Sequence, residues 1–190
     1  MIYLLGLSGY LFEAAPAAIL AGAVYLIVCR ARRTSVRPAA LLLVCYGAGL
    51  LALVWTPTNL WVELRFRAVN GYAYEPIGPL FTGSYNFVPS IVGYLTGELT
   101  GGLWARTMLV GNVLLLLPLG FLAPFVWKNM SWKRALLLGA GVSAVIELVQ
   151  PVFGRSCDVD DVLTNALGAL LGYLLFAAFR RLRAGVRQNG

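Results

Sequence analysis

Residues 106–127, RTMLVGNVLLLLPLGFLAPFVW, decide the fold, because one arginine precedes an almost unbroken apolar run. A helix needs about 20 mostly apolar residues to cross a bilayer, so this stretch predicts a membrane span. Four further stretches have the same character and predict four more spans, over residues 10–29, 38–56, 131–150 and 162–179. The chain is therefore expected to be an all-α membrane protein with five transmembrane helices.

The composition agrees with a multi-pass protein of a cell membrane. Of the 190 residues, 59% are hydrophobic and 12% are charged, about half the charged share of a soluble domain. The mean hydropathy is +0.78. The net charge of +7 is not typical of nucleic-acid binding, because the bases lie in short clusters between apolar runs and not on one patch. The three cysteines predict no disulfide framework.

The distribution of charge predicts the orientation. Eleven bases and no acids lie between spans one and two, between spans three and four, and after span five: Arg30, Arg32, Arg33, Arg37, Lys128, Lys133, Arg134, Arg180, Arg181, Arg183 and Arg187. The other side holds the remaining four bases and all eight acids. Positive residues collect on the cytoplasmic side. The amino end is therefore expected outside the cell, and the carboxyl end in the cytoplasm.

These spans divide the chain into four parts. Residues 1–56 hold the first two transmembrane helices, and residues 57–105 form a long extracellular loop. Residues 106–179 form a three-helix core, with a short outer loop near residues 151–161. Residues 180–190 form a basic cytoplasmic tail.

A short β-hairpin is expected inside the long loop. Between residues 62 and 68, apolar and charged residues alternate, and a period of two is typical of a strand. Asn70-Gly71 then provides a hairpin turn, and residues 72–75 return. An interfacial helix over the same residues is the alternative.

Polar residues lie at the outer ends of three predicted spans. They are Asn112 in the third span, Ser143, Glu147 and Gln150 in the fourth, Asp161 and Asn165 in the fifth, and Arg155, Asp158 and Asp160 in the short loop. Polar groups inside a span are costly and usually face the interior of the helix bundle. Because these groups share one depth, they predict a polar pocket that opens at the outer leaflet.

Several of these residues also have a purely structural interpretation. Asp160 or Asp161 would cap the fifth helix, because aspartate is a favoured N-cap. Glu147 and Arg155 would form an ion pair between a helix and a loop. Asn112 would make an interhelical hydrogen bond. In that case the polar residues only hold the helices together.

Small residues predict close helix packing. Gly168 and Gly172 are four residues apart in the fifth span, and Gly139 and Ser143 have the same spacing in the fourth. Small residues at this spacing let two helix backbones approach closely in a membrane. Packing is the expected role of both pairs.

The order of motifs in the second half resembles the VanZ-like family of bacterial membrane proteins. The motifs are Asn86-Phe87-Val88-Pro89, Gly111-Asn112 with Leu117-Pro118-Leu119-Gly120-Phe121, E-x-x-Q at 147–150, R-x-x-D-x-D-D at 155–161 and N-x-x-G at 165–168. The resemblance covers about residues 85–179, and the first two spans resemble the family in hydropathy alone. Ser90 departs from the family, which often has an aromatic residue there.

The resemblance implies a role at the bacterial cell surface. The founding member of the family is associated with resistance to the glycopeptide antibiotic teicoplanin. The family positions in this chain are Asn86, Pro89, Asn112, Glu147, Gln150, Arg155, Asp158, Asp161 and Asn165. The resemblance implies no reaction.

One hypothesis is a module that binds or masks a membrane lipid or a lipid-linked cell-wall precursor. Arg155 would hold a phosphate or carboxylate in a forked contact. Asn112, Gln150 and Asn165 would supply neutral hydrogen bonds, and Asn86 and Asp158 would complete the ligand-binding set. No cofactor is needed for this role.

An enzyme that modifies such a lipid or glycan is the alternative. Glu147 and Asp161 would act as general acid and base. Asp158, Asp160 and Asp161 could hold a hard cation such as Mg²⁺ or Ca²⁺ through oxygen ligands. The chain has no histidine, which excludes a Ser-His-Asp triad and makes zinc improbable. Polar groups at one leaflet, without an internal repeat, argue against a transporter.

Overall fold

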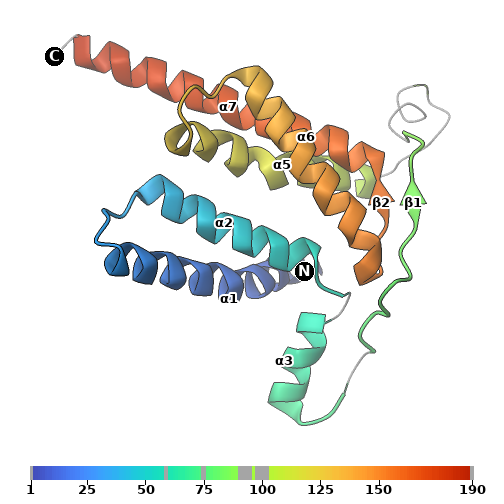
Figure 1. Ribbon diagram of the computed structural model, residues 1–190. Coiled ribbons are helices and arrows are strands. Elements are labelled where there is room, and N and C mark those ends of the chain that lie inside the picture. Colours follow the sequence, from blue (N-terminus) through green and yellow to red (C-terminus); the bar gives the residue numbers. More distant parts are fainter. Residues whose placement is uncertain (1, 58–59, 74–75, 90–95, 97–102, 189–190) are drawn as a thin grey trace. The chain divides into compact units, whose positions relative to one another are not determined.

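The computed structural model describes residues 2–57, 60–73, 76–89, 96 and 103–188. Helices dominate this part of the chain (Figure 1): α1 (Ile2–Ala31), α2 (Pro38–Val54), α3 (Leu60–Asn70), α5 (Leu103–Val126), α6 (Trp132–Val149) and α7 (Val159–Gln188). A turn of 3-10 helix, Gln150–Phe153, follows α6. Two short strands, β1 (Tyr85–Asn86) and β2 (Cys157–Asp158), pair with each other.

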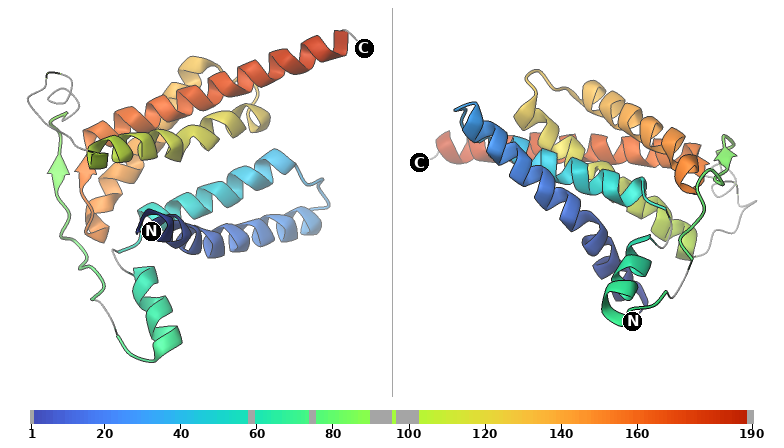
Figure 2. Two further views of the ribbon diagram at one scale, coloured as in Figure 1. Left: turned by 180° about the vertical axis from the view of Figure 1, so that it is seen from behind. Right: turned by 60° about the horizontal axis from the view of Figure 1, so that its bottom comes forward.

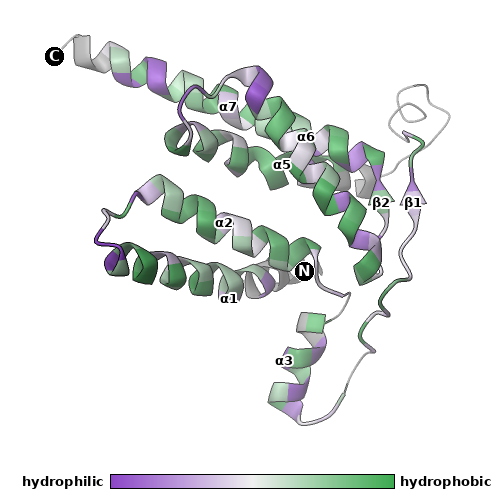
Figure 3. Cartoon of the chain, viewed as in Figure 1, coloured by the Kyte–Doolittle hydropathy of each residue, from purple (hydrophilic) through white to green (hydrophobic). Residues whose placement is uncertain are grey.

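Four helical segments are long and apolar enough to cross a membrane: Glu13–Ala31, Leu109–Val126, Trp132–Phe153 and Val159–Gly185. Apolar residues run along them, and hydrophilic ones gather at turns and helix ends (Figure 3). The chain is therefore a multi-pass membrane protein. The second predicted span forms α2, which is apolar but has only 17 residues. A spanning helix has about 20 residues, so a membrane crossing by α2, the total of five crossings and the orientation stay predictions.

By their contacts, the residues group into two compact units, each described by itself below. The first unit combines Met1–Asn86 with Ile146–Cys157, and the second combines Phe87–Val145 with Asp158–Gly190.

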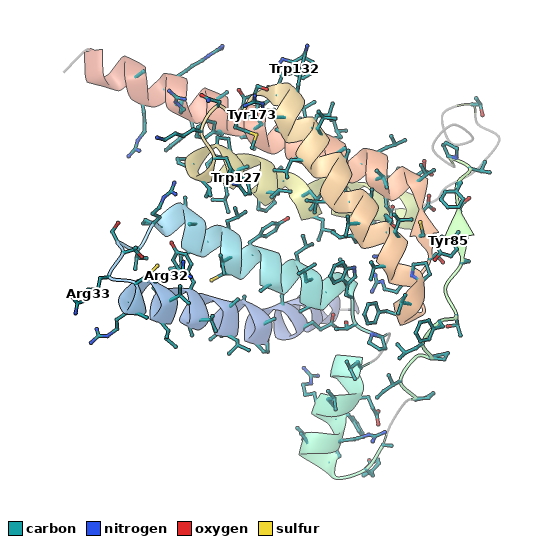
Figure 4. All side chains as sticks on the ribbon, viewed as in Figure 1. Arg32, Arg33, Tyr85, Trp127, Trp132 and Tyr173 are labelled. Carbon is teal, nitrogen blue, oxygen red and sulfur yellow. The ribbon has the colours of Figure 1, made fainter. Side chains whose placement is uncertain are left out.

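In the first unit, α1 and α2 form an antiparallel pair. A Cβ added at Gly49 would lie 3.3 Å from Ala14 Cβ, and one added at Gly22 would lie 2.8 Å from Cys45 Sγ. The two helices therefore run in opposite directions, as Figures 1 and 2 show. The connecting turn begins at Arg33, whose φ of 52° is left-handed. Figure 4 labels Arg32 and Arg33 at this turn.

Residues 60–70 form the helix α3, so the predicted strand is wrong and the helical alternative is confirmed. Arg67 Nε donates to Glu63 Oε1 at 2.5 Å, and Asn70 Nδ2 donates to the carbonyl oxygen of Phe66 at 3.0 Å. Both pairs are four residues apart, which brings side chains together on a helix but not on a strand. Gly71 and Tyr72 follow as a bend, and residues 74–75 of the expected return strand lie outside the described residues.

In the second unit, α5 and α7 run parallel, and small residues let them approach. A Cβ added at Gly168 would lie 2.1 Å from the carbonyl oxygen of Val113, and one added at Gly172 would lie 2.0 Å from that of Leu117. The partner positions advance together, which defines a parallel pair. The glycine spacing thus serves close packing, as predicted.

The helix α6 runs antiparallel to α7. A Cβ added at Gly139 would lie 2.5 Å from Ala169 Cβ, whereas Ser143, four residues later, bonds to Asn165, four residues earlier than Ala169. In this unit, α5 and α7 therefore advance toward the same end and α6 toward the other. The start of α5, the end of α6 and the start of α7 share one end.

Candidate functional site

The start of α7 is fixed by Asp158. Its Oδ1 accepts a hydrogen bond from the backbone N–H of Asp160 at 3.0 Å, the N-cap interaction with the second helical residue. The prediction that Asp160 or Asp161 is the cap is therefore wrong. The helix begins at Val159, so only the residue before it can hold the cap position. Asp160 and Asp161 fall in the first turn, where carboxylates favour the helix dipole.

A polar network joins α5, α6 and α7. Asn112 Nδ2 of α5 donates to Asp161 Oδ1 of α7. Ser143 Oγ of α6 donates to the carbonyl oxygen of Asp161 at 3.4 Å, and Asn165 Nδ2 donates to Ser143 Oγ at 2.9 Å. The interhelical hydrogen bond expected of Asn112 is confirmed. The network also confirms that Asn112, Asp161 and Asn165 lie at one end of the helices.

The network is deeply buried, and one of its acceptor atoms receives no hydrogen bond from the described residues. Ser143 is 0% exposed and Asn165 is 1% exposed. Asn165 Oδ1 is buried and has no hydrogen-bond partner among the described residues, and a buried polar atom without one costs about 1–3 kcal/mol. Thr164, one residue earlier, bonds the carbonyl oxygen of Asp160 at 2.8 Å. The network thus leaves one buried amide oxygen without a donor among the described residues.

In the first unit, Glu147 and Gln150 lie together. With the Gln150 amide oriented to donate, its nitrogen lies 3.0 Å from Glu147 Oε2 and 3.1 Å from the carbonyl oxygen of Ser156. Glu147 is 2% exposed and Gln150 is also buried. Trp55 Nε1 donates to the carbonyl oxygen of Ile146 at 3.5 Å. The E-x-x-Q pair therefore ties the end of α6 to the loop that follows it.

The segment before β1 holds the loop that carries Arg155. The backbone N–H of Phe81 donates to the carbonyl oxygen of Val152 at 2.8 Å, and that of Cys157 donates to Ser84 O at 2.8 Å. A Cβ added at Gly83 would lie 2.0 Å from the carbonyl oxygen of Arg155. Only glycine permits this approach, and the sequence analysis did not single it out.

Asn86 and Arg155 both belong to this first unit. Asn86 lies in β1 and is half-buried. The backbone N–H of Arg155 donates to the carbonyl oxygen of Gln150 at 3.2 Å, and its side chain is exposed. The backbone of Arg155 is therefore held in place by a hydrogen bond, and its side chain is accessible to solvent.

One acid that interacts with Arg155 is Glu13. Glu13 of α1 is half-buried and interacts electrostatically with Arg155. Among the described residues, a salt bridge within 4.0 Å joins Arg67 to Glu63, and the ion pair expected between Glu147 and Arg155 stays a prediction. Glu13 was missed, although a lone carboxylate in the first predicted span is a costly residue that could have marked it.

The structure gives the metal hypothesis no support. Within the described ranges, no three His, Cys, Asp or Glu side chains gather as ligands of one ion. Asp158 instead caps α7, and Asp161 accepts from Asn112. Of the two candidate catalytic carboxylates, Glu147 belongs to the first unit and Asp161 to the second.

A comparison with known families agrees with the resemblance seen in the motifs. The family model described as VanZ/LLP1 matches residues 40–180. No curated protein and no solved structure matches the chain. The matched residues make up more than half of the chain and contain α5, α6, the Arg155 loop and most of α7. This multi-pass membrane protein belongs to the VanZ/LLP1 family.

Proposed function

We propose that this protein binds the polar head of an envelope lipid or of a lipid-linked cell-wall precursor at the outer leaflet of a bacterial membrane. Binding or masking such a ligand would account for the association of the family's founding member with teicoplanin resistance. The proposal assigns the polar ends of the helices to the outer side, where the charge distribution puts them.

The observation that carries this proposal is the network of Asn112, Ser143, Asp161 and Asn165. A carboxylate, two amides and a hydroxyl meet at one end of three helices. Helix association in membranes is sustained by small residues and single polar contacts, and Gly168 and Gly172 already provide close packing here.

Independently of the network, Arg155 of the first unit is the residue we propose for binding an anionic group. A guanidinium forms two parallel hydrogen bonds with a phosphate or carboxylate. Its backbone is held by Gln150 and closely approached by Gly83, and its side chain is exposed. Glu13 interacts with it electrostatically and would orient the guanidinium before the ligand arrives.

The test compares ligand binding by two arginine variants. The full chain, in nanodiscs of phosphatidylcholine, is titrated with a polyprenyl-diphosphate-linked disaccharide peptide. Arg155→Gln should weaken binding tenfold or more, because hydrogen bonds to charged groups contribute about 1.5–3 kcal/mol. Arg65→Gln is the matched control, since Arg65 is also exposed and on the predicted outer side. Equal binding by the two variants would refute the proposal.

Glu147→Gln separates binding from catalysis. A binding module keeps its affinity for the precursor in this variant and leaves the precursor chemically unchanged. Loss of a product that the unsubstituted protein forms, with binding intact, would make the protein an enzyme. In a susceptible bacterium, expression of the unsubstituted chain should raise tolerance to teicoplanin, and Arg155→Gln should abolish that effect.

A further inference from the structure

The last turns of α7 extend beyond the helix against which they pack. The rings of Phe125 and Phe176 lie with centroids 4.8 Å apart, and α5 ends at Val126. From Phe176, α7 continues to Gln188, about 18 Å at 1.5 Å per residue. Figures 1 and 2 show this end of α7 reaching past the end of α5.

This projecting segment is basic, and the described carboxylates of the second unit lie elsewhere. Bases gather at this end of the helices: Lys128, Lys133, Arg134, Arg180, Arg181 and Arg183. The described acids of the same unit, Asp158, Asp160 and Asp161, lie at the other end, at the start of α7. Among the residues that the structure describes, none of these bases pairs with a carboxylate. The segment therefore carries positive charge that no described carboxylate neutralises.

The arginines continue the packing face of α7. Gly172, Phe176, Arg180 and Arg183 follow one another at spacings of four, four and three, which keeps them on one side of a helix. Alongside α5 this face carries glycine and phenylalanine, and beyond the end of α5 it carries arginine. The same face thus changes from one that packs on α5 to one that carries arginines beyond the end of α5.

Aromatic rings hold the arginines close to the helix. The Arg180 Cζ lies 5.7 Å from the ring centroid of Phe176, and the Arg183 Cζ lies 5.1 Å from that of Phe179. A cation over a ring face is attracted by the ring. The edge of the guanidinium stays available for hydrogen bonds to phosphate oxygens.

An apolar stripe runs beside these arginines. Leu175, Phe179 and Leu182 are spaced four and three residues apart, and Leu182 is 72% exposed. This stripe continues the apolar surface of the spanning part of α7. A helix with one apolar face and one basic face is typical of segments that lie in the headgroup region of a bilayer.

We propose that the carboxyl-terminal turns of α7 bind anionic phospholipids, with Arg180 and Arg183 on the phosphates and Leu182 on the acyl chains. The apolar stripe favours a lipid over a soluble acidic protein, which would leave Leu182 exposed. Trp127 and Trp132 flank the turn between α5 and α6, as an aromatic belt at headgroup depth would. This surface lies at the opposite end of the second unit from the polar network and does not depend on it.

The test measures the affinity of the full chain for phosphatidylglycerol relative to phosphatidylcholine, by native mass spectrometry of the detergent-solubilised protein. The unsubstituted chain should prefer phosphatidylglycerol. The triple variant R180Q/R181Q/R183Q should lose this preference by at least tenfold and by up to on the order of 100-fold, about fivefold per arginine. The matched control is R30Q/R32Q/R33Q, which removes the same charge from the turn between α1 and α2 and should stay within about twofold.

Two outcomes would overturn the proposal: no preference in the unsubstituted chain, or an equal loss in both triple variants. If R180Q/R181Q/R183Q does not fold, R180K/R181K/R183K and L182Q decide. The lysine variant should keep most of the preference, and L182Q should weaken lipid binding with all charges intact. An unchanged L182Q, or displacement of phosphatidylglycerol by glycerol phosphate, would show that the segment binds free anions and not a lipid.

Discussion

The approach of α7 to α5 predicts opposite effects for two glycine-to-alanine substitutions. A Cβ added at Gly172 would lie 2.0 Å from the carbonyl oxygen of Leu117 and 2.8 Å from the backbone nitrogen of Phe121. Cβ atoms essentially never come within 3.0 Å of another heavy atom. The two helices would therefore have to separate by at least about 1 Å, since both clashing atoms are backbone. At Gly141 of α6, a Cβ would meet nothing within 4 Å.

The magnitudes follow from the two environments. Overpacking a close contact costs about 1–3 kcal/mol, and separation also weakens Cα–H···O contacts worth about 0.5–1 kcal/mol each. Alanine recovers about 1 kcal/mol of helix propensity at either position. Gly172→Ala should therefore destabilise the protein by about 1–3 kcal/mol, and Gly141→Ala should stabilise it by up to about 1 kcal/mol.

The assay is reversible unfolding by SDS in mixed micelles, followed by circular dichroism. The midpoint for Gly172→Ala should fall below that of the unsubstituted chain, and the midpoint for Gly141→Ala should match or exceed it. If Gly172→Ala unfolds at the same midpoint as Gly141→Ala or at a higher one, α5 and α7 are not in contact at this point. The parallel register, and with it the bond between Asn112 and Asp161, would then be wrong.

Further substitutions test the cap, the first turn and the network, each by the same unfolding assay. Asp158→Ala should cost about 1 kcal/mol, the usual loss of an N-cap, and Asp158→Asn should restore most of it; equal losses would show that the side chain does not cap α7. Arg33→Gly should stabilise by about 1 kcal/mol, because a left-handed residue after a helix strains any side chain but glycine, whereas Arg32→Gly should not. A double-mutant cycle on Asn112→Ala and Asp161→Ala should give a coupling of about 0.6–1.7 kcal/mol, and no coupling would remove the contact.

The sequence predicts the spans well because hydropathy acts locally. The hydropathy of residues 106–127 predicts α5 by itself. The depth of Asn112 in the membrane is then given by its position within that apolar run. Asp161 and Asn165 share a helix face by spacing alone. Their meeting with Asn112 then requires only that three neighbouring helices alternate in direction, which short connections impose.

Two kinds of feature could not be predicted from the sequence. In some places two local patterns fit equally well, and in others the contact joins segments that are far apart in the chain. In α3 the alternation of charged and apolar residues fits a strand, while Glu63 and Arg67 fit a helix equally well. Three aspartates lie within four positions at the start of α7, and each is a suitable N-cap. Only the observed start of the helix shows that Asp158 is the one that caps it. Glu13 and Gly83 act on Arg155 across more than 70 residues of chain, and no local pattern reports such a contact.

Because α2 has only 17 residues, its length leaves open whether it crosses the membrane. The distribution of charge favours one of the two answers. If α2 crosses, α5 runs from the outer to the inner side, and all three basic clusters share one side of the membrane. If α2 does not cross, the Arg33 turn would face the side opposite to Lys128 and Arg180, which violates the bias that orients membrane helices. A helix of 17 residues is about 26 Å long, and bilayers thin locally to match spans a few Å short of 30 Å at a modest cost. The cost of a helix that is a few Å short is smaller than the cost of placing a basic cluster on the wrong side of the membrane. The charge distribution therefore favours a crossing by α2 and an outer position for the network of Asn112 and Asp161.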